Sequence, residues 1–203
     1  YEALVNDYTH SIANEIKQSN SVLHPFMITV RFDKIDLSNT TDYKRFMFFT
    51  NSTWNQYSKV YRFILSQLDR HHNQKPHICP KTYDFLDVDG TSDFINAPFS
   101  ETTIPHIHSI YLIHEKTIPA LQNLQNDKFY NVVNHHSMCD YVRTIDARPI
   151  THNVPKAVAY CSKFLDNCYA KKLINDYPLF NQFPITDEEK EALALERQKL
   201  PHY

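Results

Sequence analysis

Apolar side chains recur at helical spacing in several stretches of the chain. Residues 1–20 carry one at every third or fourth position, and residues 42–69 repeat this pattern over a longer stretch. The period is that of a helix with one buried face, so we expect an N-terminal helix and a long helix that covers one face of a sheet. Residues 117–134 predict a further helix and its connection. A capping box at Thr186, followed by charged residues, predicts a C-terminal helix over residues 186–203.

Shorter stretches between these helices alternate between apolar and polar residues or are almost wholly apolar, which predicts strands. They are residues 26–32, 83–90, 104–114 and 141–146. The run at 104–114 is nearly unbroken, as is typical of a strand in the middle of a sheet, and we expect it to pair antiparallel with the strand before it. A proline-bounded aromatic segment at 177–184 is expected to pack across the domain. The fold class is therefore expected to be α+β, with a central, mostly antiparallel sheet flanked by helices.

Two histidines occupy alternate positions of the expected central strand. His106 and His108 are separated by one residue, so their side chains emerge on the same face of the strand. Two adjacent imidazoles can hold one divalent metal ion, although two surface histidines on a half-exposed strand would give the same pattern. The strand expected to pair with this one carries Asp87 and Asp89 on one face. The pairing would bring a carboxylate beside the imidazoles.

A short helix is predicted over residues 154–165, after Asn153 as its N-cap. Its apolar stripe consists of Ala157, Val158, Cys161 and Leu165. Tyr160 and Lys163 lie three positions apart and are therefore neighbours on the helix surface. A phenol and an ammonium group so placed suit attack on a phosphodiester, with Tyr160 as nucleophile and Lys163 offsetting negative charge. An ordinary amphipathic tyrosine beside a solvated lysine would show the same spacing.

These motifs, in this order, resemble the HUH endonucleases, specifically the rolling-circle replication initiators with one catalytic tyrosine. The family's His-hydrophobe-His motif is matched by His-Ile-His at residues 106–108, and its later Tyr-x-x-Lys motif by Tyr-Cys-Ser-Lys at residues 160–163. The resemblance covers roughly residues 24–170 of the chain. Conjugative relaxases carry the tyrosine before the histidines and fit less well. The resemblance implies a palm-like sheet with the tyrosine helix laid across its metal-binding face.

The resemblance also implies a divalent metal ion, Mg²⁺ or Mn²⁺, as the cofactor. His106 and His108 would bind this ion, and a carboxylate or another polar ligand would complete the site. Asp87 and Asp89 are the candidates for that ligand, and the pattern does not choose between them. Glu101, five residues before the histidine pair, is a third option.

The implied activity is nicking and joining of single-stranded DNA. Tyr160 would form a 5′-phosphotyrosine and release a 3′-OH, and Lys163 would steady the charge. Arg143 and Arg148 are candidates for phosphate contacts, with plain surface charge as the simpler alternative. The implied partners are single-stranded DNA at the replication origin of a plasmid or phage, or at an element end, together with a host helicase and polymerase.

Composition narrows the function further. The chain has 203 residues, of which 42% are hydrophobic, so it is long enough for a single domain with a hydrophobic core. The resemblance implies that the part of this domain shared with the family is about residues 24–170. It has one glycine, which excludes a P-loop and a Gly-rich dinucleotide loop, so we expect no nucleotide cofactor. The net charge of −2 argues mildly against a protein that coats nucleic acid, but a nicking enzyme needs only a local basic track.

The expected location is the cytoplasm. No apolar run is long enough to span a membrane, no signal peptide is visible, and the four cysteines form no Cys-x-x-Cys pair. The chain begins at Tyr1 rather than Met, as expected of a domain excised from a longer protein.

Two other functions would use the same motifs. A single-strand DNA transposase of the same superfamily would need all of these residues. A metal- or DNA-binding module without catalysis would need His106 and His108 but not Tyr160. A zinc deaminase is excluded, because the sequence has no His-x-Glu motif combined with Pro-Cys-x-x-Cys.

Overall fold

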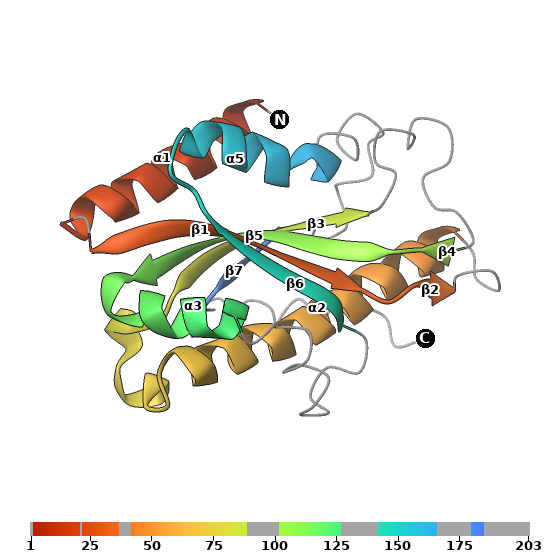
Figure 1. The fold of residues 1–203 in the computed structure, drawn as a ribbon. Coiled ribbons are helices and arrows are strands. Elements are labelled where there is room, and N and C mark those ends of the chain that lie inside the picture. Colours follow the sequence, from red (N-terminus) through yellow and green to blue (C-terminus); the bar gives the residue numbers. More distant parts are fainter. Residues whose placement is uncertain are drawn as a thin grey trace.

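A five-stranded antiparallel sheet forms the centre of the molecule. The computed structural model describes residues 2–20, 22–36, 42–88, 102–126, 142–165 and 180–184. The strands are β1 (Leu23–Phe32), β3 (Lys81–Val88), β5 (Pro105–His114), β6 (Val142–Pro149) and β7 (Phe180–Phe183). Their order is β6-β1-β5-β3-β7, and every neighbouring pair is antiparallel. The histidine strand β5 is therefore central, and its predicted antiparallel pairing with β3 is confirmed (Figure 1).

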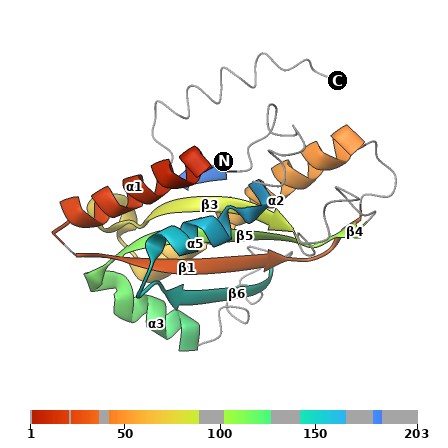
Figure 2. The same cartoon turned by 90° about the horizontal axis from the view of Figure 1, so that it is seen from above.

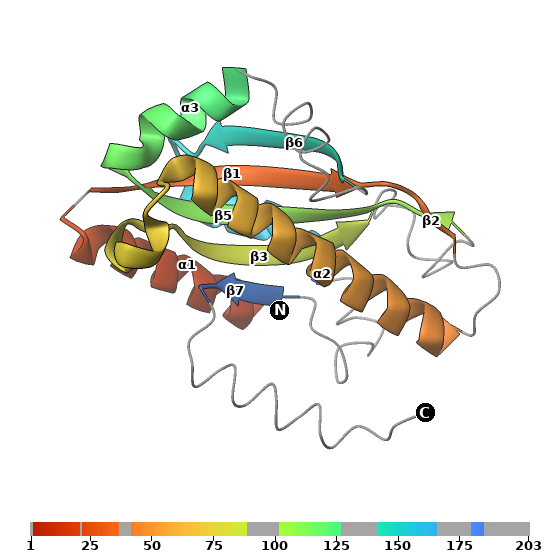
Figure 3. The same ribbon diagram turned by 90° about the horizontal axis from the view of Figure 1, so that it is seen from below.

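Helices cover both faces of the sheet. One face carries α1 (Glu2–Gln18) and α5 (Val154–Cys161), as Figure 2 shows. The opposite face carries α2 (Asp42–Leu68) and α3 (Ile118–Asn126), which are seen in Figure 3. The predicted fold class, α+β with an antiparallel sheet flanked by helices, is confirmed.

Short elements complete the described fold. Strands β2 (Ile35–Asp36) and β4 (Thr102–Thr103) pair as a small separate ribbon. The 3₁₀ turns are η1 (His72–Gln74), η2 (Pro76–Ile78) and η4 (Glu115–Thr117). In the chain, β2 follows β1 and β4 precedes β5.

Strand alternation divides the buried side chains between two cores. The core beneath α1 and α5 contains Ile12, Tyr83, Phe85, Ile110, Leu112, Val158 and Cys161. The core beneath α2 and α3 contains Leu86, Val88, Ile107, Tyr111 and Ile113, among others. Because β5 is buried on both faces, its sequence is almost continuously apolar, and the two histidines are exceptions that need an explanation.

Several element boundaries differ from the expected ones. Strand β3 begins at Lys81, two residues before the predicted start, and the predicted residues 89 and 90 lie outside the described residues. The aromatic segment near the C-terminus adds an edge strand, β7, which pairs with β3 through Phe180–Phe183. Residues 127–134 of the third predicted helix and the whole predicted C-terminal helix lie outside the described residues.

A second carboxylate is buried on the α2 face of the sheet. Asp84 is paired with Ser109 across β3 and β5 and is completely buried. The Tyr57 hydroxyl donates to Asp84 Oδ1 at 2.7 Å, and the Thr82 hydroxyl donates to Asp84 Oδ2 at 2.7 Å. Burial raises the pKa of Asp84 to about 7, because desolvation outweighs these hydrogen bonds.

The raised pKa of Asp84 predicts a loss of stability with increasing pH. The folded state binds this proton more tightly than the unfolded state, so its stabilising effect is complete below about pH 4 and is lost as the pH rises through about 7. The difference between the two pKa values corresponds to about 4 kcal/mol. We expect Asp84→Asn to remove most of this dependence, as measured by urea unfolding at pH 5 and pH 8.

The matched control for this prediction is a partly exposed aspartate, Asp69. The pKa of Asp69 is lowered, first by a hydrogen bond from the amide of His71 and then by the Lys75 side chain. Its stabilising effect is therefore already present at pH 5 and does not change up to pH 8. Asp69→Asn should shift stability equally at both pH values. An Asp84→Asn protein that keeps the wild-type pH dependence would contradict the prediction.

Candidate metal and nucleophile site

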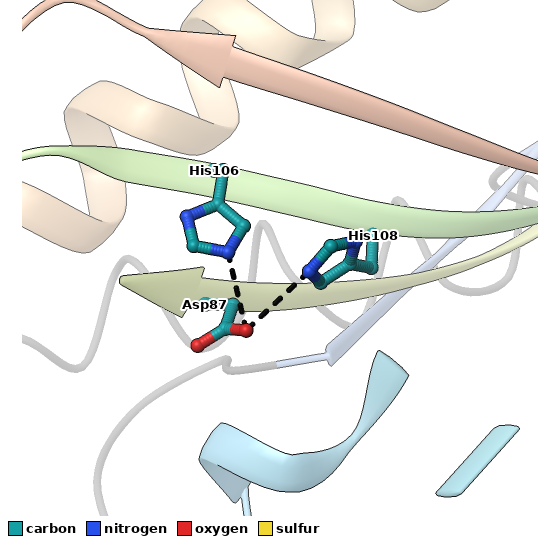
Figure 4. A group of neighbouring side chains, drawn as sticks. All are labelled: Asp87, His106 and His108. Carbon is teal, nitrogen blue, oxygen red and sulfur yellow. Dashed lines mark ion pairs between the residues drawn. The ribbon is translucent and has the colours of Figure 1, made fainter. Parts of the chain in front are cut away.

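The register of β3 and β5 brings one of the two candidate aspartates directly opposite the histidine pair. Asp87 is the partner of His106, and opposite residues of an antiparallel pair share a face of the sheet. Asp87 Oδ2 lies 3.2 Å from His106 Nε2 and 3.4 Å from His108 Nε2. The three side chains point toward one another from the two strands (Figure 4). All three are buried, and one ligand atom of each lies within 4.8 Å of the others, so they can share one ion.

The chemistry of these donors fits a divalent metal ion. Two imidazole nitrogens and one carboxylate oxygen converge, and a carboxylate that is completely buried requires a nearby cation. Burial lowers the pKa of His108, with the neighbouring His106 adding to this effect. The neutral imidazole is therefore favoured, and this is the form that binds metals.

Thr29 on β1 fixes the orientation of one imidazole. Its hydroxyl lies 3.0 Å from His108 Nδ1, and Thr29 is the partner of His108 in the pairing of β1 with β5. When Nδ1–H donates to Thr29, the lone pair of His108 is on Nε2, the nitrogen that faces Asp87. Such a contact orients a metal-binding imidazole and selects its tautomer.

Helix α5 is fixed on the sheet by its cap and its apolar side. The Lys156 N–H donates to Asn153 Oδ1 at 3.0 Å, so the predicted N-cap is confirmed. Val158 and Cys161 are completely buried against the sheet. The side chain of Tyr160, in contrast, is 49% exposed. The helix therefore presents its tyrosine to solvent while its other side packs on the core.

Tyr160 and Lys163 lie over the Asp87–His106–His108 group. The ring of Tyr160 is 5.1 Å from the ring of His108. Lys163 Nζ is 5.0 Å from the centre of the Tyr160 ring and 3.0 Å from Asp87 Oδ2. The same carboxylate oxygen thus faces two imidazoles and one ammonium group. Side chains from β3, from β5, and from α5 and the residues that follow it meet at this point, although Asp87 and Lys163 are far apart in the chain.

Among the described residues, the other predicted site residues, Arg143 and Arg148, lie away from this group. Asp89 and Glu101 lie outside the described residues, so Asp87 is the candidate carboxylate that the structure places beside the histidines. Arg143 and Arg148 are exposed on β6, which β1 separates from β5. Arg148 Nε lies 2.7 Å from Asp146 Oδ2. The two arginines therefore lie at the sheet edge.

Two polar residues of β1 were missing from the set predicted from the sequence. Thr29 and Arg31 are the partners of His108 and His106, so they lie on the same face as the histidine pair. From the sequence, residues 26–32 were interpreted only as a core strand. The available signal was the alternation itself, because a threonine and an arginine two positions apart interrupt an otherwise apolar strand.

Comparison with known proteins adds no family to these observations. No family model, no curated protein and no solved structure matches the chain. Among the described residues, no helix has both the length and the apolar character needed to cross a membrane. The function of the chain is therefore inferred from its motifs and from the geometry of the site.

Proposed function

We propose that the protein is a metal-dependent endonuclease that nicks and joins single-stranded DNA through a covalent tyrosine intermediate. The supporting observation is the position of Tyr160, half-exposed beside a buried group of two histidines and an aspartate. A nucleophile, a positive charge and a set of metal donors within a few ångströms are the parts that such a reaction requires. The resemblance to the rolling-circle replication initiators supports the same activity.

His106, His108 and Asp87 would hold the metal ion. A mixed set of imidazole and carboxylate ligands suits Mn²⁺ and tolerates Mg²⁺. When bound, such an ion polarises a phosphate oxygen and orients the phosphodiester. Thr29 would keep the His108 ring in the orientation that presents Nε2 to this position.

Tyr160 would carry out the covalent step. Its oxygen attacks phosphorus, the bond from phosphorus to the 3′ oxygen breaks, and the DNA is left with a free 3′-OH and a 5′-phosphotyrosine. The phenol loses its proton to solvent, and the leaving 3′ oxygen gains one. Lys163 would stabilise the negative charge on the phenolate and the phosphate. Attack by a 3′-OH on the phosphotyrosine reverses the reaction and joins two strands without ATP.

The proposed role is initiation of rolling-circle replication. The free 3′-OH is a primer for a polymerase, and the covalent link holds the 5′ end until the strands are joined. The chain would act on single-stranded DNA at an origin, together with a host helicase and polymerase.

The experiment that tests this function is a search for a covalent adduct. The protein is incubated with a pool of labelled single-stranded oligonucleotides and Mn²⁺, and the products are separated on a denaturing gel. We expect a protein–DNA adduct that disappears when EDTA is added, together with a product that a polymerase can extend. If Mn²⁺ and DNA bind but no oligonucleotide forms an adduct, the protein is a binding module without catalysis.

A further inference from the structure

Lys163 lies at the carboxylate oxygen that a metal ion would need. Its Nζ is 3.0 Å from Asp87 Oδ2, and the nitrogens of His106 and His108 face the same oxygen at 3.2 and 3.4 Å. A metal ion bound by that oxygen would lie about 2.0–2.6 Å from it. The ammonium group and the ion would then be two cations side by side at one oxygen, and they would repel each other.

We propose that Lys163 and the metal ion compete for Asp87 Oδ2, so that binding of the metal releases Lys163 toward Tyr160 and the DNA phosphate. This inference rests on the proposed function, because it places the metal at this group of residues. It adds that the lysine has two alternative partners, the carboxylate before the metal binds and the nucleophile afterwards.

The surroundings of the two charges favour this exchange. Asp87 is completely buried, so its carboxylate needs a cation beside it at all times, either the Lys163 ammonium group or a metal ion. Lys163 is 41% exposed, so its ammonium group can leave the carboxylate and regain water at little cost. The Tyr160 ring, 5.0 Å away, is already within reach of the same ammonium group. A short rotation of a flexible side chain is therefore sufficient.

The exchange couples metal binding to activation of the nucleophile. Without the metal, the positive charge that would support the tyrosine is held by Asp87. With the metal, Lys163 is available to the phenolate and the phosphate. Removal of Lys163 should consequently have effects of opposite sign: it should strengthen metal binding and slow the covalent reaction. A lysine that only supports the reaction would have no effect on metal affinity.

The test is the Mn²⁺ affinity of the whole chain, measured by calorimetry or by electron paramagnetic resonance of free Mn²⁺. We expect Lys163→Met to bind Mn²⁺ roughly 3- to 10-fold more tightly than the wild type, the range expected for loss of one partly screened competing charge. Lys156→Met is the matched control, because it removes the same charge from an exposed position of α5. Its affinity should stay close to that of the wild type.

Equal or weaker binding by Lys163→Met would overturn the competition. Failure of the proposed metal site would look different. Mn²⁺ would bind neither the wild type nor Lys163→Met, or replacing His106 and His108 with Ala would leave Mn²⁺ binding by each of these two proteins unchanged. Tighter binding by Lys163→Met that depends on both histidines supports the inference even if the wild type binds too weakly to measure.

A second measurement uses the wild-type chain and does not depend on the folding of a variant. The rate at which an acylating reagent modifies Lys163 is followed by mass spectrometry, with and without Mn²⁺. An ion-paired amine reacts slowly, so we expect Mn²⁺ to accelerate modification of Lys163 and to leave Lys156 unchanged. An unchanged or slower rate at Lys163 would also overturn the competition.

Discussion

Replacing Tyr160 with Phe is expected to abolish the covalent protein–DNA adduct and to leave Mn²⁺ and DNA binding close to wild type. The substitution removes one hydroxyl group from a half-exposed side chain, so no buried hydrogen bond is broken. The ring keeps its contact with His108 and its position beside Lys163. The phenolic oxygen of Tyr160 is the atom that forms the bond to phosphorus, and phenylalanine has no such atom. We therefore expect the adduct to fall below detection.

The control for this variant is Tyr8→Phe. Tyr8 is a partly exposed tyrosine of α1, on the same face of the sheet as α5, and its ring stacks on Phe180. This variant should form the adduct at the wild-type rate. Mass spectrometry of the digested adduct should find the nucleotide on the peptide that contains Tyr160. A nucleotide on the peptide with Tyr141 or Tyr169, or an adduct that persists in Tyr160→Phe, would show that another tyrosine attacks.

Replacing His106 and His108 together with Ala is expected to abolish Mn²⁺-dependent cleavage and to weaken Mn²⁺ binding by more than about 100-fold. Changes in the residues that merely orient metal ligands cost about 10- to 100-fold in affinity, so loss of two ligands should cost more. Asp87→Asn should act in the same direction, because it removes the negative charge and keeps the shape of the side chain. Calorimetry gives the affinity, and circular dichroism shows whether each variant is folded.

An exposed histidine provides the comparison for these variants. His24 lies on β1 and is exposed, so His24→Ala should bind Mn²⁺ like the wild type. Unchanged Mn²⁺ binding by the double variant would show that the metal ion does not bind at His106 and His108. Loss of cleavage with retained Mn²⁺ binding would assign the histidines a role in contacting DNA.

Strand pairing was predictable because it depends on alternation along the sequence. The apolar character of residues 104–114 indicated a central strand. Its expected antiparallel pairing with the preceding strand indicated a carboxylate beside the histidine pair, but the register that selects Asp87 rather than Asp89 came from the structure. The apolar stripe of the tyrosine helix was predictable for the same reason, and Val158 and Cys161 are indeed buried. Such patterns are local, so they can be interpreted without knowing how the elements pack.

Contacts between side chains of different helices and strands were harder to predict from the sequence. Lys163 was expected to face a phosphate, but it also lies 3.0 Å from Asp87, because α5 contacts β3 and β5 and the residues that follow this helix lie over the same strands. The contact of Thr29 with His108 requires that β1, rather than another strand, lies next to β5. The segment that forms β7 gave no strand pattern, since it has only four residues and pairs at a sheet edge. These features depend on tertiary packing, which periodicity alone does not specify.

The spacing of residues along β3 and β5 matters for the site as much as the identity of the residues. Asp84 and Asp87 are three positions apart, so they lie on opposite faces of the sheet, and Ser109 follows His108 with the same result. Deleting Phe85 would move Asp87 into the apolar core beneath α2 and turn Leu86 toward α5. During divergence of this chain, insertions and deletions should therefore be eliminated from these two strands and tolerated in the connections between elements. Selection would act on the spacing even where the side chains themselves can vary.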